Sequence, residues 1–384
     1  MKIVNFAGFR SEAQKRLPSF MFEYIDGGSY DEHTLRRNVE DFRAVVLRQR
    51  VLRDVSNLRL GTHLFGRDWA IPVGLSPVGI AGFFRRRGEV QAVRAAEAAG
   101  IPMVLSTMSC CALEEVRAAS ARPFWMQIYM IRDRGFMKDL IGRMEKAGID
   151  TLFLTVDLAI NGIRYRDRIG GLAGSQSLLA RPDRLIDILS HPAWALDVGV
   201  MGRPHTIGNM APAMPNGAGL KQFQAWVARN FDPSVTYKDI AWLRQHWKGR
   251  LVLKGITDPG DAARAAEEGM DGIVVSNHGG RQLDGSLSSI AALPAVREAV
   301  GGRMPILLDG GVRSGLDVLR ALALGADGVL LGRAWAYALA ARGGAGITSL
   351  LAIIKEELEV AMSLTGQSDV RSLDKDLAIA RPQG

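Results

Sequence analysis

Four segments of the chain share one pattern of polar and apolar positions: a helix that ends in glycine, followed at once by a short apolar run. They are Ala99–Ser106, Ala147–Thr155, Glu268–Ser276 and Leu324–Gly332. Glycine at this point is typical of a helix C-cap, and an apolar run without alternation is typical of a parallel strand buried on both faces. The repeat therefore predicts helices and strands in alternation.

Four further apolar runs complete a set of eight predicted strands. They are Ala70–Leu75, Pro123–Tyr129, Arg250–Lys254 and Met304–Asp309. Eight strands that alternate with helices are typical of a closed (β/α)8 barrel, the TIM barrel of the α/β class. We therefore predict this barrel as the fold of the chain.

The pattern also predicts a single domain, 1–384, in which the barrel carries additions. Residues 1–70 precede the first strand as a helical cap, the barrel occupies 71–342, and 343–384 hold a last helix, Gly346–Leu364, and a charged tail. Within the cap, the predicted helices are Met21–Gly28 and Asp31–Asp41.

A surplus of about 65 residues, at about 165–230, follows the fourth predicted strand. This insert is rich in glycine, proline, methionine and tryptophan and contains one short predicted helix, His191–Asp197. A long excursion at the catalytic end of a barrel is typical of a lid, a partner contact or a membrane contact. We expect it to cover the mouth of the site.

Composition and charge narrow the classes of partner. The 384 residues carry a net charge of +8 without a run rich in lysine and arginine, which favours anionic small ligands or an anionic membrane surface over nucleic acid. The two cysteines, Cys110 and Cys111, are adjacent and predict neither a disulfide framework nor a metal site. We find no signal peptide and no apolar span of 18 residues, so we expect a cytoplasmic protein, free or peripheral on the inner face of the cell membrane.

The stretch Gly272–Asp284 carries the most specific chemistry in the sequence. An apolar strand ends at Ser276, and a histidine, two glycines and Arg281 follow within five residues. Histidine is the usual proton acceptor near neutral pH, and arginine is the fork-shaped partner of a carboxylate. The simpler alternative is an ordinary strand-to-helix turn whose histidine and arginine are exposed. We favour the second interpretation, in which His278 is a base and Arg281 binds an anion beside it.

The last two strands end in loops that combine glycine with arginine. These are Asp309-Gly-Gly311-Val-Arg313 and Gly332-Arg333. In barrels, the loops after the seventh and eighth strands are the habitual phosphate site. Either these are ordinary turns or they bind a phosphorylated cofactor, and the absence of a Walker loop and of a GxGxxG motif after a strand argues against a nucleoside triphosphate or a Rossmann dinucleotide.

The remaining strand ends add a cation, a carboxylate and a pocket for an acid. Lys254 is either a Schiff-base amine, as in an aldolase, or a fixed cation beside an electron-rich ring. Asp157 lies where it pairs with His278 and stabilises an imidazolium. Hydroxyl and guanidinium groups for a carboxylate come from Tyr24, Tyr129, Arg164 and Arg281. For Tyr24 the pattern alone favours the simpler alternative of a ring that covers the core with its hydroxyl in water. Together these groups predict a flavin mononucleotide (FMN) site that oxidises a 2-hydroxy acid.

At these residues the chain resembles the FMN-dependent α-hydroxy-acid dehydrogenase/oxidase family, and within it the quinone-linked bacterial branch that oxidises L-lactate. The resemblance covers nearly the whole chain, and SNHGGRQLD is its most specific string. The strings that carry it are Tyr24-Ile-Asp-Gly-Gly, Thr34-Leu-Arg-Arg-Asn, Ser276-Asn-His-Gly-Gly-Arg-Gln-Leu-Asp284 and Leu331-Gly-Arg333.

The resemblance also implies a role for each matched residue. His278 takes a proton, Asp157 stabilises its cation, and Lys254 compensates the charge of the reduced flavin. Arg281, Tyr24 and Arg164 bind the substrate carboxylate, and Tyr129 lies near the hydroxyl. The flavin ring contacts the backbone of Pro77, Val78 and Gly79 and the side chains of Ser106, Gln127 and Thr155. The ribityl chain meets Ser276 and Asp309, and the phosphate meets Gly311, Arg313, Gly332 and Arg333.

Substrate, acceptor and assembly follow from the same resemblance. L-lactate, oxidised to pyruvate with electrons passed to a quinone or similar acceptor, is the first expectation, and a homotetramer is expected. Gly79 fits the lactate and mandelate dehydrogenases, Met108 departs from the aromatic residue of many glycolate oxidases, and Asn161-Gly162 resembles the mandelate branch. L-mandelate or another aryl or long-chain hydroxy acid, or oxygen as acceptor, is therefore the second reading. An inactive, membrane-associated scaffold barrel is the alternative from a different class.

Overall fold

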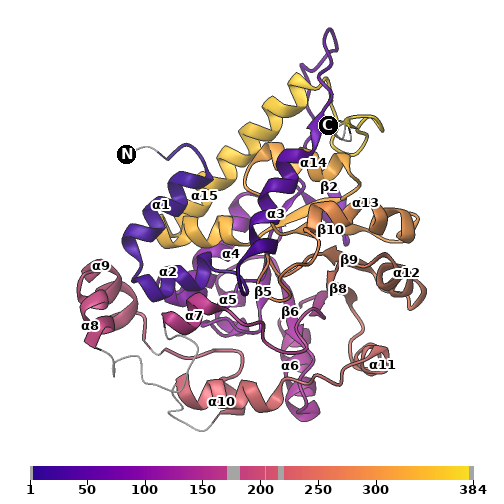
Figure 1. Cartoon of the computed structure of the whole chain (residues 1–384). Coiled ribbons are helices and arrows are strands. Elements are labelled where there is room, and N and C mark those ends of the chain that lie inside the picture. The colour runs from indigo at the N-terminus through magenta and orange to yellow at the C-terminus, as the bar shows by residue number, and fades with distance from the viewer. Residues whose placement is uncertain (1–2, 171–181, 204, 215–219, 380–384) are drawn as a thin grey trace.

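The computed structural model describes residues 3–170, 182–203, 205–214 and 220–379 and contains an eight-stranded parallel sheet (Figure 1). The strands run in the order β4-β11-β10-β9-β8-β7-β6-β5, so sequence neighbours lie side by side. They are β4 (Val73–Leu75), β5 (Val104–Ser106), β6 (Trp125–Tyr129), β7 (Thr151–Thr155), β8 (Arg250–Ile256), β9 (Gly272–Val275), β10 (Ile306–Asp309) and β11 (Gly328–Leu331).

The sheet closes on itself through a parallel bridge between Leu75 of β4 and Met103, directly before β5. Inward-facing side chains fill the interior and include Trp125, Phe153 and Val252, which are all fully buried. The predicted (β/α)8 barrel is confirmed; seven strands are shorter than their apolar runs, and β8 extends two residues beyond the predicted end at Lys254. A strand is defined by its ladder, whereas the apolar run also includes residues buried just outside it.

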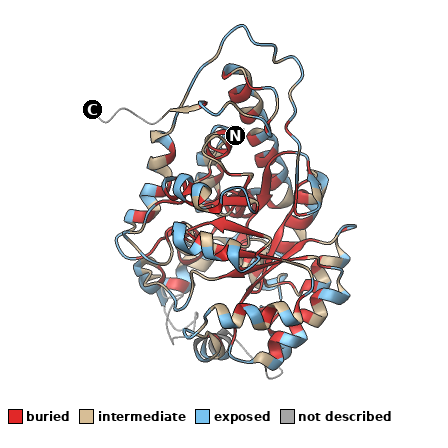
Figure 2. Ribbon diagram, turned by 90° about the vertical axis from the view of Figure 1, so that its right-hand side faces the viewer, coloured by how far each residue is buried: buried red, intermediate tan, exposed pale blue. Residues whose placement is uncertain are grey.

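Helices follow the strands and cover the outside of the barrel. They are α4 (Gly88–Ala98), α5 (Leu113–Ala118), α6 (Arg134–Lys146), α11 (Tyr237–His246), α12 (Pro259–Glu267), α13 (Ser289–Val300), α14 (Gly315–Ala323) and α15 (Arg333–Leu364), with the 3₁₀ turn η1 (Ala81–Phe83) after β4. Figure 2 shows buried residues concentrated in the strands and on the helix faces that pack against them. The apolar layer beneath the helices forms one buried cluster, and the interior of the barrel forms a second, separate one.

The cap before the barrel contains three helices, α1 (Phe6–Arg16), α2 (Ser19–Asp26) and α3 (His33–Ala44). The predicted helices at Met21–Gly28 and Asp31–Asp41 correspond to α2 and α3, and α1 was not predicted. Helix α1 packs along α15 (Figure 1). The pair β1 (Val46–Leu47) and β12 (Ala378–Ile379) ties the end of the cap to the end of the described chain.

A hairpin of two short strands, β2 (Thr62–Leu64) and β3 (Arg67–Trp69), closes the N-terminal end of the barrel and was not predicted from sequence. Its side chains Phe65 and Trp69 pack against Trp125 inside the barrel, Phe65 edge-on and Trp69 tilted. Strands of three residues leave no periodic signal, and the turn at Phe65 and Gly66, both at positive φ, was the only local cue.

Helix α15 combines the last helix of the barrel with the predicted final helix. Arg342 and Gly343 break the helical backbone, and the second part ends at Leu364, as predicted. By length and composition α15 could cross a membrane, but 61% of its apolar window is buried inside the protein. It therefore has the burial of a core helix.

The insert folds into short helices at the carboxyl end of the strands. Parts of the expected 165–230 region, at 171–181, 204 and 215–219, lie outside the described residues. The rest contains α7 (Tyr165–Ile169), α8 (Pro182–Leu189), α9 (Pro192–Trp194), η2 (Ala195–Val200), η3 (Ala211–Ala213) and α10 (Leu220–Asn230). The helix predicted at His191–Asp197 corresponds to α9 and the start of η2.

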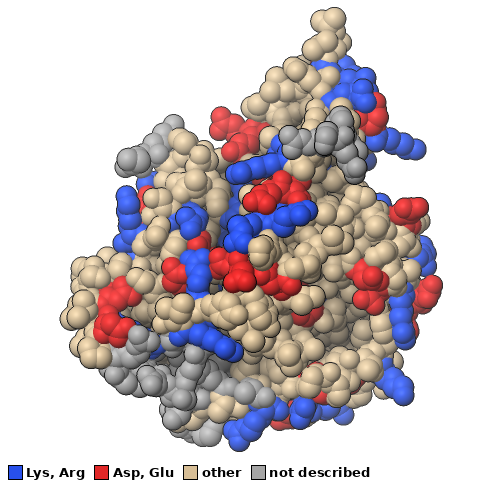
Figure 3. Space-filling view, viewed as in Figure 1, with Lys and Arg blue, Asp and Glu red and all other residues tan. Residues whose placement is uncertain are grey.

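Many charged side chains on the surface form ion pairs. Figure 3 shows basic and acidic side chains interleaved across the middle of the face it presents. Arg50 and Arg53, for example, pair with Asp376 and Asp374 near the C-terminus. Burial raises the pKa of Cys110 and of Cys111, which suits two small apolar packing residues.

Candidate active site

A cavity of about 1450 Å³ opens at the carboxyl ends of the strands. All of the predicted site residues line it except Asp157 and Ser276, which lie directly behind His278 and Lys254. The insert supplies part of the wall on the outer side, as expected of a cover, through Ile188, Trp194, Ala195, Val198, Val200, Arg203 and His205. Convergent polar groups in this cavity mark the candidate active site.

His278 and Asp157 form the predicted pair. Nδ1 of His278 lies 2.9 Å from Oδ1 of Asp157. A carboxylate accepts only from an N–H, so this contact fixes the neutral ring with its proton on Nδ1 and leaves Nε2 as the free proton acceptor. His278 holds a left-handed backbone conformation at φ 58°, and its N–H donates to Ser276 Oγ. The ring is therefore oriented from both its backbone and its side chain.

Gly255 makes room for this pair and was not predicted. It lies at φ 111° in an irregularity of β8, and a Cβ there would come within 2.6 Å of the Asp157 side chain. The same irregularity follows Lys254 directly. The sequence signal for Gly255 is a single glycine inside an apolar strand. Such a glycine often marks a bulge, or a place where another group lies close to the strand backbone.

Lys254 belongs to a buried polar network behind the cavity. Its Nζ lies 2.9 Å from Oδ2 of Asp309 and donates to Ser276 Oγ at 3.0 Å. Ser76 donates to the same carboxylate at 2.8 Å. Burial would raise the pKa of Asp309, but Lys254 and the hydrogen bonds outweigh it and lower that pKa. The network holds Lys254 as a fixed cation, which argues against a Schiff-base nucleophile.

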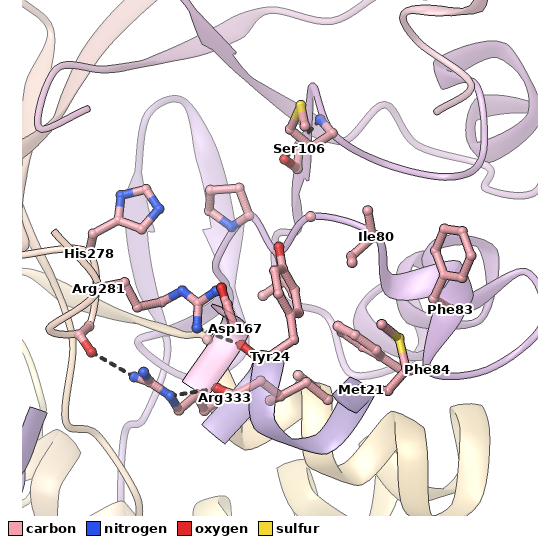
Figure 4. A pocket seen from close by; sticks show the side chains of 18 of the residues that line it. Met21, Tyr24, Ile80, Phe83, Phe84, Ser106, Asp167, His278, Arg281 and Arg333 are labelled. Atoms are coloured by element: carbon pink, nitrogen blue, oxygen red, sulfur yellow. Dashed lines mark hydrogen bonds between the residues drawn. The ribbon is translucent and has the colours of Figure 1, made fainter. Parts of the chain in front are cut away.

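Three residues that we call the carboxylate clamp, Tyr24, Arg164 and Arg281, face the same side of the cavity. Figure 4 shows Tyr24 and Arg281 side by side with His278 nearby, and the Arg281 guanidinium carbon lies 4.8 Å from the centre of the Tyr24 ring. Arg164 is partnered by Asp167 at 3.3 Å, whereas Arg281 faces no carboxylate of the described chain. Burial, and then repulsion from Arg164, lowers the pKa of Arg281 to about 10.

Tyr129 lies on β6 with its ring 5.0 Å from that of Phe231. Burial, followed by the charge of Asp157, raises the pKa of its phenol. The hydroxyl is thus held as a neutral hydrogen-bonding group.

The two arginines of the predicted phosphate site differ in their surroundings. The Arg333 guanidinium donates to the backbone carbonyls of Ile25, Gly27 and Gly279, each at 2.8 Å. The Arg313 guanidinium lies 4.0 Å from the Phe6 ring and makes no hydrogen bond to a described residue. Burial lowers the pKa of both groups, that of Arg333 to about 10. The charge of Arg313 is therefore available to bind an anionic ligand.

These donors fit FMN. The unpaired guanidinium of Arg313 lies beside the start of α15, where backbone N–H groups favour an anion. Gly311, at φ 90°, would place a Cβ 1.9 Å from the Asn38 carbonyl oxygen, so only glycine permits this cavity wall. Deeper in the cavity, Nε2 of the buried Gln127 has no hydrogen-bond partner within the described chain. It is therefore free to donate to a polar edge of the flavin ring. Across the described ranges, no three His, Cys, Asp or Glu side chains gather as metal ligands.

A second residue that the sequence did not single out is Asp26, at the end of α2. It accepts hydrogen bonds from Arg10, Arg166 and Tyr337. Burial alone would raise its pKa, but these three donors hold it well below the usual range. Asp26 therefore fixes the end of the helix that carries Tyr24, and an acid inside the apolar helix α2 was the available signal.

Comparison with known proteins identifies relatives over the whole chain. Residues 13–380 match the family model described as FMN-dependent dehydrogenase. An L-lactate dehydrogenase of Caulobacter vibrioides is 57% identical over 373 residues, 97% of each chain. One of Xanthomonas oryzae pv. oryzae is 55% identical over 368 residues, which are 96% of this chain and 94% of the relative.

Solved structures agree with these relatives. The monotopic membrane protein (S)-mandelate dehydrogenase is 34% identical, with a TM-score of 0.93 over 99% of this chain and 100% of that one. A mandelate oxidase is 36% identical, with a TM-score of 0.81 over 96% of each chain. The expected family, enzyme class and FMN cofactor are confirmed.

Proposed function

The chain belongs to the FMN-dependent dehydrogenase family, and from that premise we propose that it oxidises L-lactate to pyruvate with His278 as the base. The observation that carries the proposal is the His278–Asp157 contact of 2.9 Å in the cavity that the carboxylate clamp also lines. A base and an anion clamp in one cavity are what oxidation of a 2-hydroxy acid requires. The intact pair also argues against an inactive scaffold.

The residues divide the work of this reaction. Nε2 of His278 takes a proton from the substrate, and Asp157 stabilises the imidazolium that forms. Arg281, Tyr24 and Arg164 hold the substrate carboxylate, and the neutral Tyr129 phenol hydrogen-bonds the hydroxyl. When bound, FMN would supply the redox chemistry by taking up the two electrons and the second hydrogen of the oxidation.

The cavity walls suit FMN along its whole length. Lys254, Gln127 and the backbone of 77–79 would hold the ring, together with Ser106 and Thr155. Asp309 would meet the ribityl chain, and Ser276, behind the cavity wall, holds Lys254 in place. For the phosphate, Arg313 supplies the charge and Gly311 and Gly332 supply backbone access, while Arg333 mainly anchors the cap. The two N–H groups of Arg333 that donate to no carbonyl complete the phosphate site.

Replacing Arg313 by alanine is expected to weaken FMN binding by roughly tenfold or more, because one charge-assisted contact contributes about 1.5–3 kcal/mol. Arg264→Ala is the matched control, since Arg264 also lies 4.0 Å from an aromatic ring but on the outside of the barrel. Quenching of FMN fluorescence on titration into apoprotein gives both affinities. Equal affinity in the two variants would move the phosphate away from Arg313.

L-mandelate is the second candidate substrate. Gly79 and Met108 line the cavity, and a Cβ on Gly79 would lie 3.1 Å from Met108 Cβ, so this wall is already close to its limit. The apolar wall beyond it, at Ile80, Phe83 and Val198, leaves room for an aryl group. The identity to the lactate enzymes exceeds that to the mandelate enzymes, and therefore we place lactate first.

Anaerobic flavin bleaching with glycolate, L-lactate and L-mandelate tests this order. We expect L-lactate to give the highest kcat/KM for bleaching. A faster reaction with L-mandelate would transfer the function to the aryl substrate, and no bleaching by any of the three would end the proposal.

We also propose that the insert docks on the inner face of the cell membrane. Helix α8, which Figure 1 shows beside α9 at one edge of the molecule, and η2, which follows α9 directly, each expose an apolar stripe. The exposed residues are Leu185, Ile186, Leu189, Leu196, Val200 and Met201. Trp194 does not belong to this surface, because it is buried against Phe20. The solved relative described as monotopic supports the same placement.

Exchanging Leu185 and Leu189 for glutamate is expected to abolish flotation with anionic vesicles. Burying two leucines contributes about 3 kcal/mol or more, so binding should fall at least about 100-fold. Val360→Glu with Leu364→Glu is the control, because this pair has the same spacing and similar exposure on α15. If wild-type protein stays in the soluble fraction at low salt, membrane docking is wrong.

A membrane-borne quinone is the acceptor that we propose. Val200 both lines the cavity and lies in the exposed stripe of η2, so an apolar molecule can reach the site from the membrane side. Reoxidation of the reduced enzyme should therefore be faster with a quinone in vesicles than with dissolved oxygen. The family resemblance further predicts a homotetramer, which sedimentation velocity measures.

A further inference from the structure

The helix that carries Tyr24 receives its N-terminal cap from the insert. Helix α2 has no side-chain cap of its own and no acidic residue in its first turn. Asp187 of α8 fills this place from 168 residues away: its carboxylate accepts from Ser19 N at 2.8 Å and from Ser19 Oγ at 3.3 Å. A carboxylate at a helix N-terminus satisfies a free N–H and interacts favourably with the helix dipole.

The opposite end of α2 meets two guanidinium groups. Arg281 Nη1 donates to the carbonyls of Tyr24, at 2.6 Å, and Gly27, at 2.9 Å. Arg333 donates to Ile25 and Gly27. Cations favour the C-terminus of a helix for the same reason that anions favour its start. The helix is therefore held by an anion at one end and by two cations at the other.

These contacts link the insert to the substrate site through one short rigid element. Tyr24 lies on α2, and Arg281 binds α2 through its Nη1 atom while stacking on the Tyr24 ring. The insert touches α2 a second time where Trp194 meets the Phe20 ring, with 6.0 Å between ring centres. The His278–Asp157 pair, in contrast, makes no hydrogen bond or ion pair to α2 or α8 among the described residues.

We propose that Asp187 is a positioning residue for the carboxylate clamp: the insert sets the place of Tyr24 and Arg281 by capping α2. This inference rests on the proposed oxidation of a 2-hydroxy acid. It predicts that loss of the cap weakens substrate binding and leaves the proton-transfer step nearly unchanged. The effect should have the size of a lost helix cap, about 2- to 30-fold in an equilibrium.

Four variants separate this role from a general loosening of the insert. Asp187→Ala removes the cap, and Asp187→Asn keeps an acceptor oxygen without the charge. Ser19→Pro removes the donor from the α2 side, at the first helical position, where proline is well tolerated. Asp197→Ala is the control, because Asp197 ties the insert to Arg85, 3.2 Å away, and not to α2.

Steady-state oxidation of L-lactate gives KM and kcat for each variant, and hydrogen exchange reports the protection of the first turn of α2. We expect Asp187→Ala and Ser19→Pro to raise KM about tenfold with kcat within about twofold, Asp187→Asn to lie between them and wild type, and Asp197→Ala to match wild type. Hydrogen exchange of the backbone amides of residues 20–23 should rise in Asp187→Ala and Ser19→Pro alone.

Three results would overturn the proposal: an unchanged KM in both Asp187→Ala and Ser19→Pro, an equal KM rise in Asp197→Ala, or a fall in kcat as large as the rise in KM. Wild-type enzyme that oxidises no hydroxy acid would instead refute the proposed function. In that case, unchanged exchange of α2 in Asp187→Ala would still reject the capping role.

Discussion

Replacing His278 by glutamine is expected to slow flavin reduction by L-lactate about 100- to 10,000-fold, the usual range for loss of a general base. Glutamine keeps a polar side chain of similar length but has no basic nitrogen near neutral pH. Because Asp157 Oδ1 lies 2.9 Å from Nδ1, the base in wild-type enzyme is Nε2. FMN should remain bound, since the Arg313 and Lys254 contacts are unchanged.

Asp157→Asn provides the graded comparison. The base survives in this variant, but its cation loses the facing carboxylate, so reduction should slow by less than in His278→Gln. Stopped-flow measurement of the flavin absorbance without oxygen gives both rates. If His278→Gln reduces its flavin at the wild-type rate with any accepted hydroxy acid, the base lies elsewhere.

The barrel and most of the site could be predicted because their signals are local. Four of the eight strands are apolar runs after a helix-ending glycine, and most of the predicted side chains lie on a strand or within a few residues of its end. Carboxyl ends of parallel strands meet at one edge of a barrel, so reading strand ends is enough to assemble distant residues. Asp157 and His278 are 121 positions apart and were predicted to pair on this ground alone.

The parts that could not be predicted depend on contacts between elements without a shared period. Asp187 caps α2 across 168 residues, and neither segment carries a motif for the other. Arg333 was expected only at the phosphate, yet three backbone carbonyls occupy its guanidinium. A sequence shows that an arginine follows a strand, but the competition between a ligand and nearby carbonyls is decided by the packing of the cap.

Exchanging Arg281 is expected to have the second large effect, on substrate recognition. The structure leaves this guanidinium buried without a carboxylate partner in the described chain, and its lowered pKa, about 10, reflects that cost. A substrate carboxylate offsets the cost and accepts two parallel hydrogen bonds. Loss of two charge-assisted bonds at about 1.5–3 kcal/mol each corresponds to about a 10²- to 10⁴-fold fall in kcat/KM.

Arg281→Lys and Arg281→Met separate the charge from the fork. A lysine keeps a cation but cannot bind a carboxylate in two parallel bonds while also reaching the Tyr24 carbonyl, so Arg281→Lys should recover only part of the loss seen in Arg281→Met. Arg164→Met should cost less, because Asp167 already pairs with Arg164. The decisive measurement is the ratio of kcat/KM for L-lactate to kcat/KM for L-lactamide. Wild-type enzyme should prefer the acid strongly, and Arg281→Met should lose most of that preference. A preference for the acid that survives in Arg281→Met would show that another cation binds the carboxylate.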